Sequence, residues 1–202
     1  MHQFKVGLIV LCTAILVSCG GRANFTAQVS FGDSLSDVGT YKVGAVAALG
    51  GGQFTINSGD GTPTNWTEFT ALKLGLSAPC AAVTGLDGLD GFAVMPPIVQ
   101  VGCTGYAQGG ARVTHSVGVG HKLTGGSNVT LGLLTTPVVT QINNHLATTV
   151  DHVFSGNEIV FVMAGANDLF FQAALIDPNA HFTSDPPIPP AAGMIYAEDA
   201  IL

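Results

Sequence analysis

The stretch "VSFGDSLSDVG", Val29 to Gly39, decides the fold and raises the question of function. Apolar and polar residues alternate from Phe25 to Phe31, which is the pattern of a half-buried strand. The run stops at Gly32, and Asp33 and Ser34 lead directly into a segment that can begin a helix. Packing gives no reason for this combination at the end of a strand, so Ser34 is a candidate nucleophile. The alternative role for Ser34 is that of a helix N-cap, which serine often fills.

Two further turns follow segments that read as strands. A short strand in "GYAQGGARV" is broken at Gly109 and Gly110, and the continuous apolar run from Ile159 to Ala164 ends at Asn167 and Asp168. A continuous apolar run predicts a strand that is buried on both faces of a parallel sheet. Ligands of open α/β sheets bind beyond the carboxyl ends of the strands, so the three turns are expected to meet in one crevice.

The residue types in these turns suit a site where negative charge develops. Ser34 at a helix N-terminus would lie in positive potential beside free backbone N–H groups. Gly110 has no Cβ, so its N–H can come close to a substrate oxygen, and Asn167 carries a side-chain N–H donor. Taken singly, Asn167 would be a turn residue and the glycine pair a tight bend. Their combination in three turns is what indicates a site.

The motifs "FGDSLSDVG", "YAQGGAR" and "MAGAND" resemble, in this order, the serine, glycine and asparagine blocks of the SGNH (GDSL-type) esterases and lipases. The resemblance extends from about Phe25 to Phe171. It implies an α/β fold with a three-layer, flavodoxin-like parallel sheet. It also implies Ser34 as nucleophile, with Gly110 and Asn167 completing an oxyanion hole that the Ser34 N–H begins. Gly109 takes the place of Gly110 if the block is shifted by one.

The resemblance also marks supporting residues and two departures. Asp33 and Asp168 match positions that usually brace the site, and Asp37 matches a position to which we assign no role. Gly105 stands where an asparagine is common, and Ala166 replaces a more usual glycine. The α/β-hydrolase motif Gly-x-Ser-x-Gly is absent, and so are phosphate-loop and dinucleotide motifs.

The chain lacks the Asp-x-x-His block from which this family takes its base. Asp177 and His181 are one residue too far apart. The remaining histidines of the mature chain are expected to be solvated, two on a surface helix and two in a glycine-rich loop: His145, His152, His115 and His121. The catalytic His and Asp are therefore expected to be absent. The chain is expected to be the N-terminal part of a fold that is incomplete at the C-terminus, and to be inactive alone.

The N-terminal segment indicates export. Residues 6–17 are apolar, which is shorter than the roughly 20 residues that span a bilayer and fits a signal peptide. The sequence "LVSC" that follows resembles the lipobox of bacterial lipoproteins, which implies a lipidated Cys19; the alternative is cleavage near Ala23. The predicted organisation is a lipoprotein-type signal peptide (1–18), a tether (19–24), the hydrolase domain (25–176) and a proline-rich or truncated tail (177–202).

Composition limits the partners. The chain of 202 residues is 47% hydrophobic and 9% charged, which suits one domain with a sizeable core. Its six Lys and Arg residues and net charge of −7 make nucleic-acid binding a poor hypothesis. In an oxidising compartment Cys80 and Cys103 are predicted to form a disulfide, the alternative being two buried thiols. No Cys/His spacing suggests a metal, and no cofactor is expected.

The sequence therefore predicts an exported serine ester hydrolase that acts on an ester or lipid substrate. It would be a bacterial outer-membrane lipoprotein held through Cys19, or a secreted or periplasmic protein. The alternative is a non-catalytic surface lipoprotein that uses the same crevice as a binding module.

Overall fold

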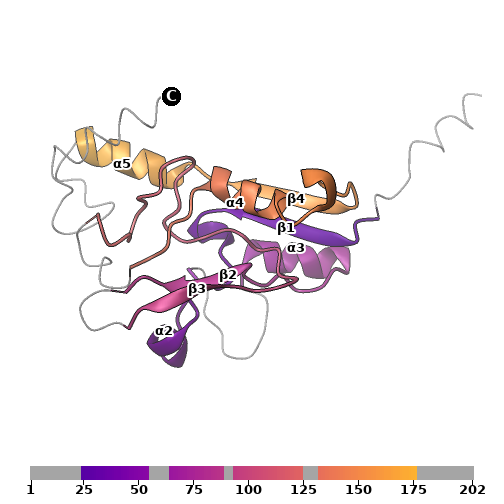
Figure 1. Cartoon of the computed structure of the whole chain (residues 1–202), viewed down its shortest axis with the longest axis horizontal. Helices are drawn as coiled ribbons and strands as arrows, with labels where there is room; N and C mark the ends of the chain where they lie inside the picture. Colours follow the sequence, from indigo (N-terminus) through magenta and orange to yellow (C-terminus); the bar gives the residue numbers. More distant parts are fainter. Residues whose placement is uncertain (1–23, 55–63, 89–92, 125–131, 177–202) are drawn as a thin grey trace, which may run out of the picture.

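The computed structural model describes residues 24–54, 64–88, 93–124 and 132–176, which form a mixed α/β arrangement with a small parallel sheet (Figure 1). The predicted signal peptide, Cys19 and the tail 177–202 lie outside the described residues. The elements in chain order are β1 (Ala27–Gly32), the 3-10 turn η1 (Ser34–Ser36), α2 (Gly44–Ala48), α3 (Trp66–Leu74), β2 (Val83–Leu86), β3 (Met95–Val99), α4 (Val138–Leu146), the 3-10 turn η3 (Val150–His152), β4 (Glu158–Met163) and α5 (Ala166–Ile176).

Strand β1 is the centre of the parallel arrangement. It pairs with β4 along its whole length, so that Gly32 lies opposite Met163. On its other side an extended segment, residues 104–108, runs in the same direction, and the N–H of Tyr106 donates to Ser30 O at 2.8 Å while the N–H of Gln108 donates to Gly32 O at 3.1 Å. The carboxyl ends of the three segments are therefore level with one another.

Both faces of β1 are covered, by α4 on one side and α3 on the other (Figure 1). Val29 and Phe31 pack against Val138 of α4. The side chain of Gln28 points the other way and donates from Nε2 to Thr67 O of α3 at 3.1 Å. The alternation in the sequence predicted a strand buried on one face, but the polar face is buried as well because α3 supplies hydrogen-bond acceptors to it.

Strand β4 is more exposed than the sequence predicts, whereas β1 is more buried. The apolar run predicted burial on both faces, yet Val160 is 37% and Val162 58% exposed. Within the described part of the chain, β4 pairs only with β1 and has a free edge. An apolar run shows that neither face of a strand is polar. It does not show whether other segments of the chain cover those faces.

The spacing of apolar residues between Thr136 and Gly156 predicts one helix, but the helix is shorter. The residues expected on its buried face are Val138, Ile142, Leu146, Val150 and Val153. Helix α4 ends at Leu146, and Val150, placed by its spacing on the buried face, is 84% exposed. Within α4 the predicted face is confirmed, since Val138 is buried and Ile142 and Leu146 are partly buried, and the polar residues Gln141 and His145 are buried beside them. Gln141 faces inward because its amide pairs with both backbone groups of Gly32: Oε1 accepts from the N–H and Nε2 donates to the carbonyl oxygen, each at 2.9 Å.

The segment from Asn65 to Gly75 predicts a short helix with an apolar face formed by Trp66, Phe69 and Leu72. Helix α3 has these bounds and ends at Gly75, which has the left-handed φ of 71° expected of a glycine C-cap. Its buried residues are Thr67 and Ala71, whereas Phe69 and Leu72 of the predicted apolar face are 50% and 63% exposed. The sequence therefore predicted where α3 begins and ends, but not which of its faces is buried.

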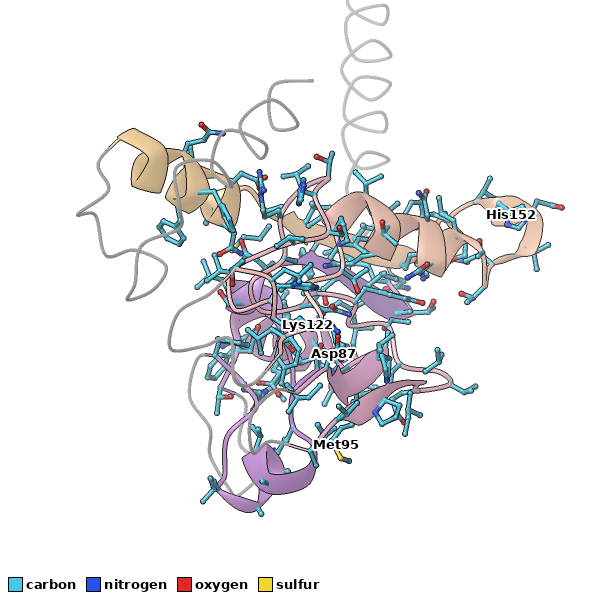
Figure 2. The ribbon with its side chains drawn as sticks, turned by 60° about the vertical axis from the view of Figure 1, so that its left-hand side comes forward. Asp87, Met95, Lys122 and His152 are labelled. Atoms are coloured by element: carbon cyan, nitrogen blue, oxygen red, sulfur yellow. A yellow bond between two sulfur atoms is a disulfide. The ribbon has the colours of Figure 1, made fainter. Side chains whose placement is uncertain are left out.

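The strands β2 and β3 form an antiparallel hairpin beside this sheet. Met95 of β3 packs against a small core that contains Tyr41 and Leu86. Cys80 and Cys103 form a disulfide that closes the hairpin at its base. Lys122 forms an ion pair with Asp87, and Figure 2 shows the two side chains close together near the middle of the molecule.

Replacing both cysteines of the disulfide with serine is expected to lower the free energy of unfolding by roughly 3 kcal/mol. The bridge spans 23 residues, and the unfolded chain regains the entropy of that loop when the bridge is removed. Urea denaturation of the oxidised wild type and of the double variant would measure the difference. An unfolding midpoint of the wild type that does not change on addition of a reductant would contradict this expectation.

Candidate active site

Ser34 lies in a tight turn that directly follows β1. Gly32 ends the strand at a φ of 148°, and a Cβ there would lie 2.1 Å from Met163 O, so only glycine allows β1 and β4 to stay paired up to this point. Asp33 caps the turn by accepting the N–H of Leu35 at 3.1 Å. Ser34 is half-buried, and neither its hydroxyl nor its N–H has a hydrogen-bond partner among residues that the structure describes.

The helix predicted to begin near Ser34 is a single 3-10 turn. The carboxylate of Asp37 explains this difference, because its Oδ1 accepts the N–H of Gly39 at 2.9 Å and that of Thr40 at 2.8 Å. Such local bonds give the backbone an alternative to the helix. The next helix, α2, begins only at Gly44.

Asp37 also joins the serine turn to the glycine turn. Its Oδ2 accepts the N–H of Gly109 at 2.8 Å, and the carboxylate is fully buried. Burial raises the pKa of Asp37 to about 6, against the effect of the three N–H donors, which favour the ionised form. The sequence assigned no role to Asp37. An aspartate two residues before a glycine is typical of a side-chain turn, but its bond to Gly109 could not be read from local sequence.

The glycine turn presents one free backbone donor. Gly110 has a φ of 80°, and a Cβ there would lie 1.9 Å from Val119 O, so this position requires glycine. The Gly110 N–H donates to no acceptor in the described ranges. The N–H of Gly109 is already bonded to Asp37, so Gly110 is the member of the pair whose donor is available to a ligand.

Asn167 lies in the first turn of α5 and is 5% exposed. Its Nδ2 donates to Ala111 O at 2.8 Å. One of the two amide hydrogens is therefore used to hold the side chain against the glycine turn, and the other remains for a ligand.

Asp168 and Arg112 make a second connection between the same two turns. The Nε of Arg112 donates to Asp168 Oδ1 at 3.1 Å, and the N–H of Val113 donates to Oδ2 at 3.0 Å. Arg112 is fully buried, and its guanidinium lies 4.6 Å from the centre of the Phe171 ring, a cation–π arrangement. The sequence marks Asp168 as a supporting residue but gives no indication of Arg112 beyond its being one of few basic residues.

The remaining carboxylate at the site is that of Asp33. Burial raises its pKa, the N–H groups of Leu35 and of Asp33 itself lower it, and the negative charge of Asp168 raises it again. The second oxygen, Oδ2, is buried without a partner among the described residues. Asp33 therefore sits next to Ser34 as a carboxyl group that gives up its proton less readily than usual.

No described histidine is hydrogen-bonded to Ser34. The rings of His115 and His121 accept the N–H two residues further on, at 3.1 and 3.2 Å, and are partly buried rather than fully exposed. His152 is exposed in η3, at the far end of the molecule in Figure 2. Asp177 and His181 lie outside the described residues.

Comparison with models of known protein families and with curated proteins finds no match to this chain. Over the described ranges, no cluster of His, Cys, Asp and Glu side chains could hold a metal ion, and no helix is long and apolar enough to cross a bilayer.

The raised pKa of Asp37 predicts a pH dependence of stability. A carboxyl whose pKa is about 6 when folded and 3.8 when unfolded stabilises the fold most below pH 3.8, and this contribution is lost as the pH rises through 6. The Asp37→Asn variant removes this titration. Relative to the variant, the wild type should therefore lose about 2.4 kcal/mol of stability between pH 4 and pH 7.

Urea denaturation of both proteins at several pH values would measure this difference. The effect of Asp33 is present in both and cancels. Asp151→Asn, at an exposed position in η3, controls for the loss of one negative charge. A difference between wild type and Asp37→Asn that stays constant over this pH range would contradict the expectation.

Proposed function

We propose that the chain carries the nucleophile and the oxyanion-binding groups of an SGNH-type serine ester hydrolase, built on the three-layer, flavodoxin-like sheet of that family. The observation that carries the proposal is a set of unused donors at the level ends of three parallel segments. The backbone N–H groups of Ser34 and Gly110 are without partners within the described part of the chain, and Asn167 retains one amide hydrogen. Donors left free in this way suit an oxygen that becomes negative during reaction.

The chemistry follows from these positions. Ser34 Oγ attacks the carbonyl carbon of an ester while a base takes its proton, and the carbonyl oxygen becomes an oxyanion. The N–H groups of Ser34 and Gly110 and the amide of Asn167 donate to that oxyanion. When the tetrahedral intermediate collapses, the alcohol leaves with a proton, and water then hydrolyses the acyl-serine.

The binding of the oxyanion depends on how firmly the turns are held. Asp37 ties the glycine turn to the serine turn, and the ion pair of Arg112 with Asp168 ties the asparagine turn to the glycine turn. These links keep the donors in place before a substrate arrives, which is the condition under which hydrogen bonds to a developing charge are most effective.

A base added from solution tests this proposal. Without an activating histidine, a serine site retains only a residual acceleration of roughly 10³–10⁴-fold over water. We expect imidazole in the buffer to increase p-nitrophenyl butyrate hydrolysis by the wild-type protein well above the rate of imidazole alone. Ser34→Ala should abolish this increase, and Asn167→Ala should reduce it by about 10²-fold or more because one oxyanion donor is lost.

Ser36→Ala is the matched control, since this serine belongs to the same turn but is fully buried. Circular dichroism would verify that each variant is folded. Equal imidazole-dependent rates for wild type and Ser34→Ala would refute the proposed nucleophile and favour the alternative of a non-catalytic binding module.

We further propose that the protein is exported and anchored to a membrane through a lipid on Cys19, which rests on the lipobox-like sequence before it. The wild type, expressed in bacteria with its leader, should partition with membranes and carry an acyl mass on its N-terminal residue. Cys19→Ser should remove both properties, whereas Cys12→Ser, inside the predicted leader, should leave them unchanged. A wild-type mature protein that begins at Asn24 without an acyl group would contradict the anchor.

A further inference from the structure

A second concave site lies between the end of α4 and the base of the β2–β3 hairpin. Its volume is about 610 Å³, within the range of roughly 300–1,000 Å³ that is usual for small-molecule sites. Residues 82–83, 99–104, Tyr106 and residues of α4 and the turn after it line the pocket, and the disulfide cysteine Cys103 forms part of its wall. It shares no residue with the turns that hold Ser34, Gly110 and Asn167.

The lining of this pocket is mostly apolar and carries no Asp, Glu, Lys or Arg, although Gln100, Thr104, Asn144 and Thr148 belong to it. Two valines at its margin, Val99 and Val101, are 70% and 98% exposed. A hydrocarbon chain bound here would bury the exposed surface of these valines. Burial of apolar surface is the main source of affinity in such sites.

Among the polar residues of the pocket, His145 is the one whose side-chain atoms are buried without a hydrogen-bond partner in the described part of the chain. The predicted solvated ring of His145 is wrong, because His145 is only 5% exposed. Its ring packs against the rings of Phe31, Tyr106 and Phe154, with centroid distances of 5.7, 5.3 and 5.3 Å. Its two ring nitrogens are buried and have no hydrogen-bond partner among the described residues. A buried polar group in this state is costly unless another molecule supplies the missing bond.

The charge around His145 restricts what that molecule can be. Burial lowers the pKa of His145 and nearby Glu158 raises it in part, so the net shift leaves the ring neutral at pH 7. A neutral imidazole has one donor and one acceptor and does not attract an anion. The carboxylate of Glu158 and the overall charge of −7 also disfavour anions here.

We propose that this pocket binds an uncharged aliphatic molecule with a single hydroxyl or ester oxygen. Its chain lies along the mostly apolar lining, and its oxygen bonds to the imidazole of His145 when the ring turns a nitrogen toward the pocket, because both nitrogens are buried in the empty site. This site is independent of the proposed ester hydrolysis, because none of its residues takes part in that chemistry. A hydroxyl can use either ring nitrogen, since it both donates and accepts.

The test uses 1-octanol as the neutral probe and octanoate as its anionic counterpart. Calorimetric titration at pH 7 should show 1-octanol binding at least tenfold more tightly than octanoate. In a long-range nitrogen NMR spectrum of the wild-type protein, 1-octanol should shift the ring signals of His145. His145→Phe should weaken 1-octanol binding about tenfold, because the ring keeps its packing but loses its hydrogen bond.

A second variant fills the pocket without touching the imidazole. Ala147 lines the pocket and is exposed, so Ala147→Phe should block binding at little cost to folding. Asn143→Phe is the matched control, one helical turn earlier, exposed and outside the lining, and should bind 1-octanol like the wild type. Ser34→Ala should also bind like the wild type, which separates this site from the proposed active site.

Equal affinity for 1-octanol in wild type and Ala147→Phe would overturn the site. Ring signals of His145 that stay constant while 1-octanol binds would overturn the assigned hydrogen bond and indicate that water satisfies the imidazole. Equal affinities for 1-octanol and octanoate would overturn the ligand class. These readouts do not depend on the folding of His145→Phe.

Discussion

The carboxylate of Asp37 is the group on which the arrangement of the candidate site depends. It accepts two N–H groups from its own turn and a third from Gly109, which lies far along the chain. These bonds stop the helix that the sequence would otherwise continue after Ser34, and they hold the glycine turn against the serine turn. The carboxylate is fully buried, and burial opposes its ionisation. Its three hydrogen bonds offset this cost and fix the positions of two turns of the candidate site.

Other buried polar side chains around β1 also connect segments that are distant in the sequence. Gln141 satisfies both backbone groups of Gly32, Gln28 bonds to α3, and Arg112 pairs with Asp168 at the start of α5. Each of these side chains reaches across from one segment to the backbone or carboxylate of another. Polar contacts of this kind specify one geometry more strictly than apolar packing does, because an unmatched buried donor or acceptor is costly. The level ends of the three parallel segments are held in this way.

The two ends of this small sheet differ in their chemistry. Where the parallel segments end, the N–H groups of Ser34 and Gly110 have no partner within the described ranges, and donors of this kind suit a developing anion. Near the base of the disulfide-closed hairpin, a mostly apolar pocket is bordered by an imidazole whose nitrogens have no partner among the described residues. Helix α4 connects them, because Gln141 supports the first region and His145 borders the second on the same buried face. The inward face of α4 therefore combines the apolar residues Val138 and Ile142 with two buried polar side chains that the spacing of apolar residues does not indicate.

Local sequence determined where the chain extends, turns and coils. The strands around Val29 and Val160, the bounds of α3 and the breaks at Gly32 and Gly110 follow from side-chain alternation and from glycine, which act over a few residues. The tertiary structure alone decided that β1 is buried on both faces while β4 is partly exposed. It also decided that His145 lies inside and that Gly110, not Gly109, has an N–H without a partner in the described part of the chain. Burial and hydrogen-bond pairing depend on neighbours far along the chain, such as Gly109 for Asp37, and no local pattern contains them.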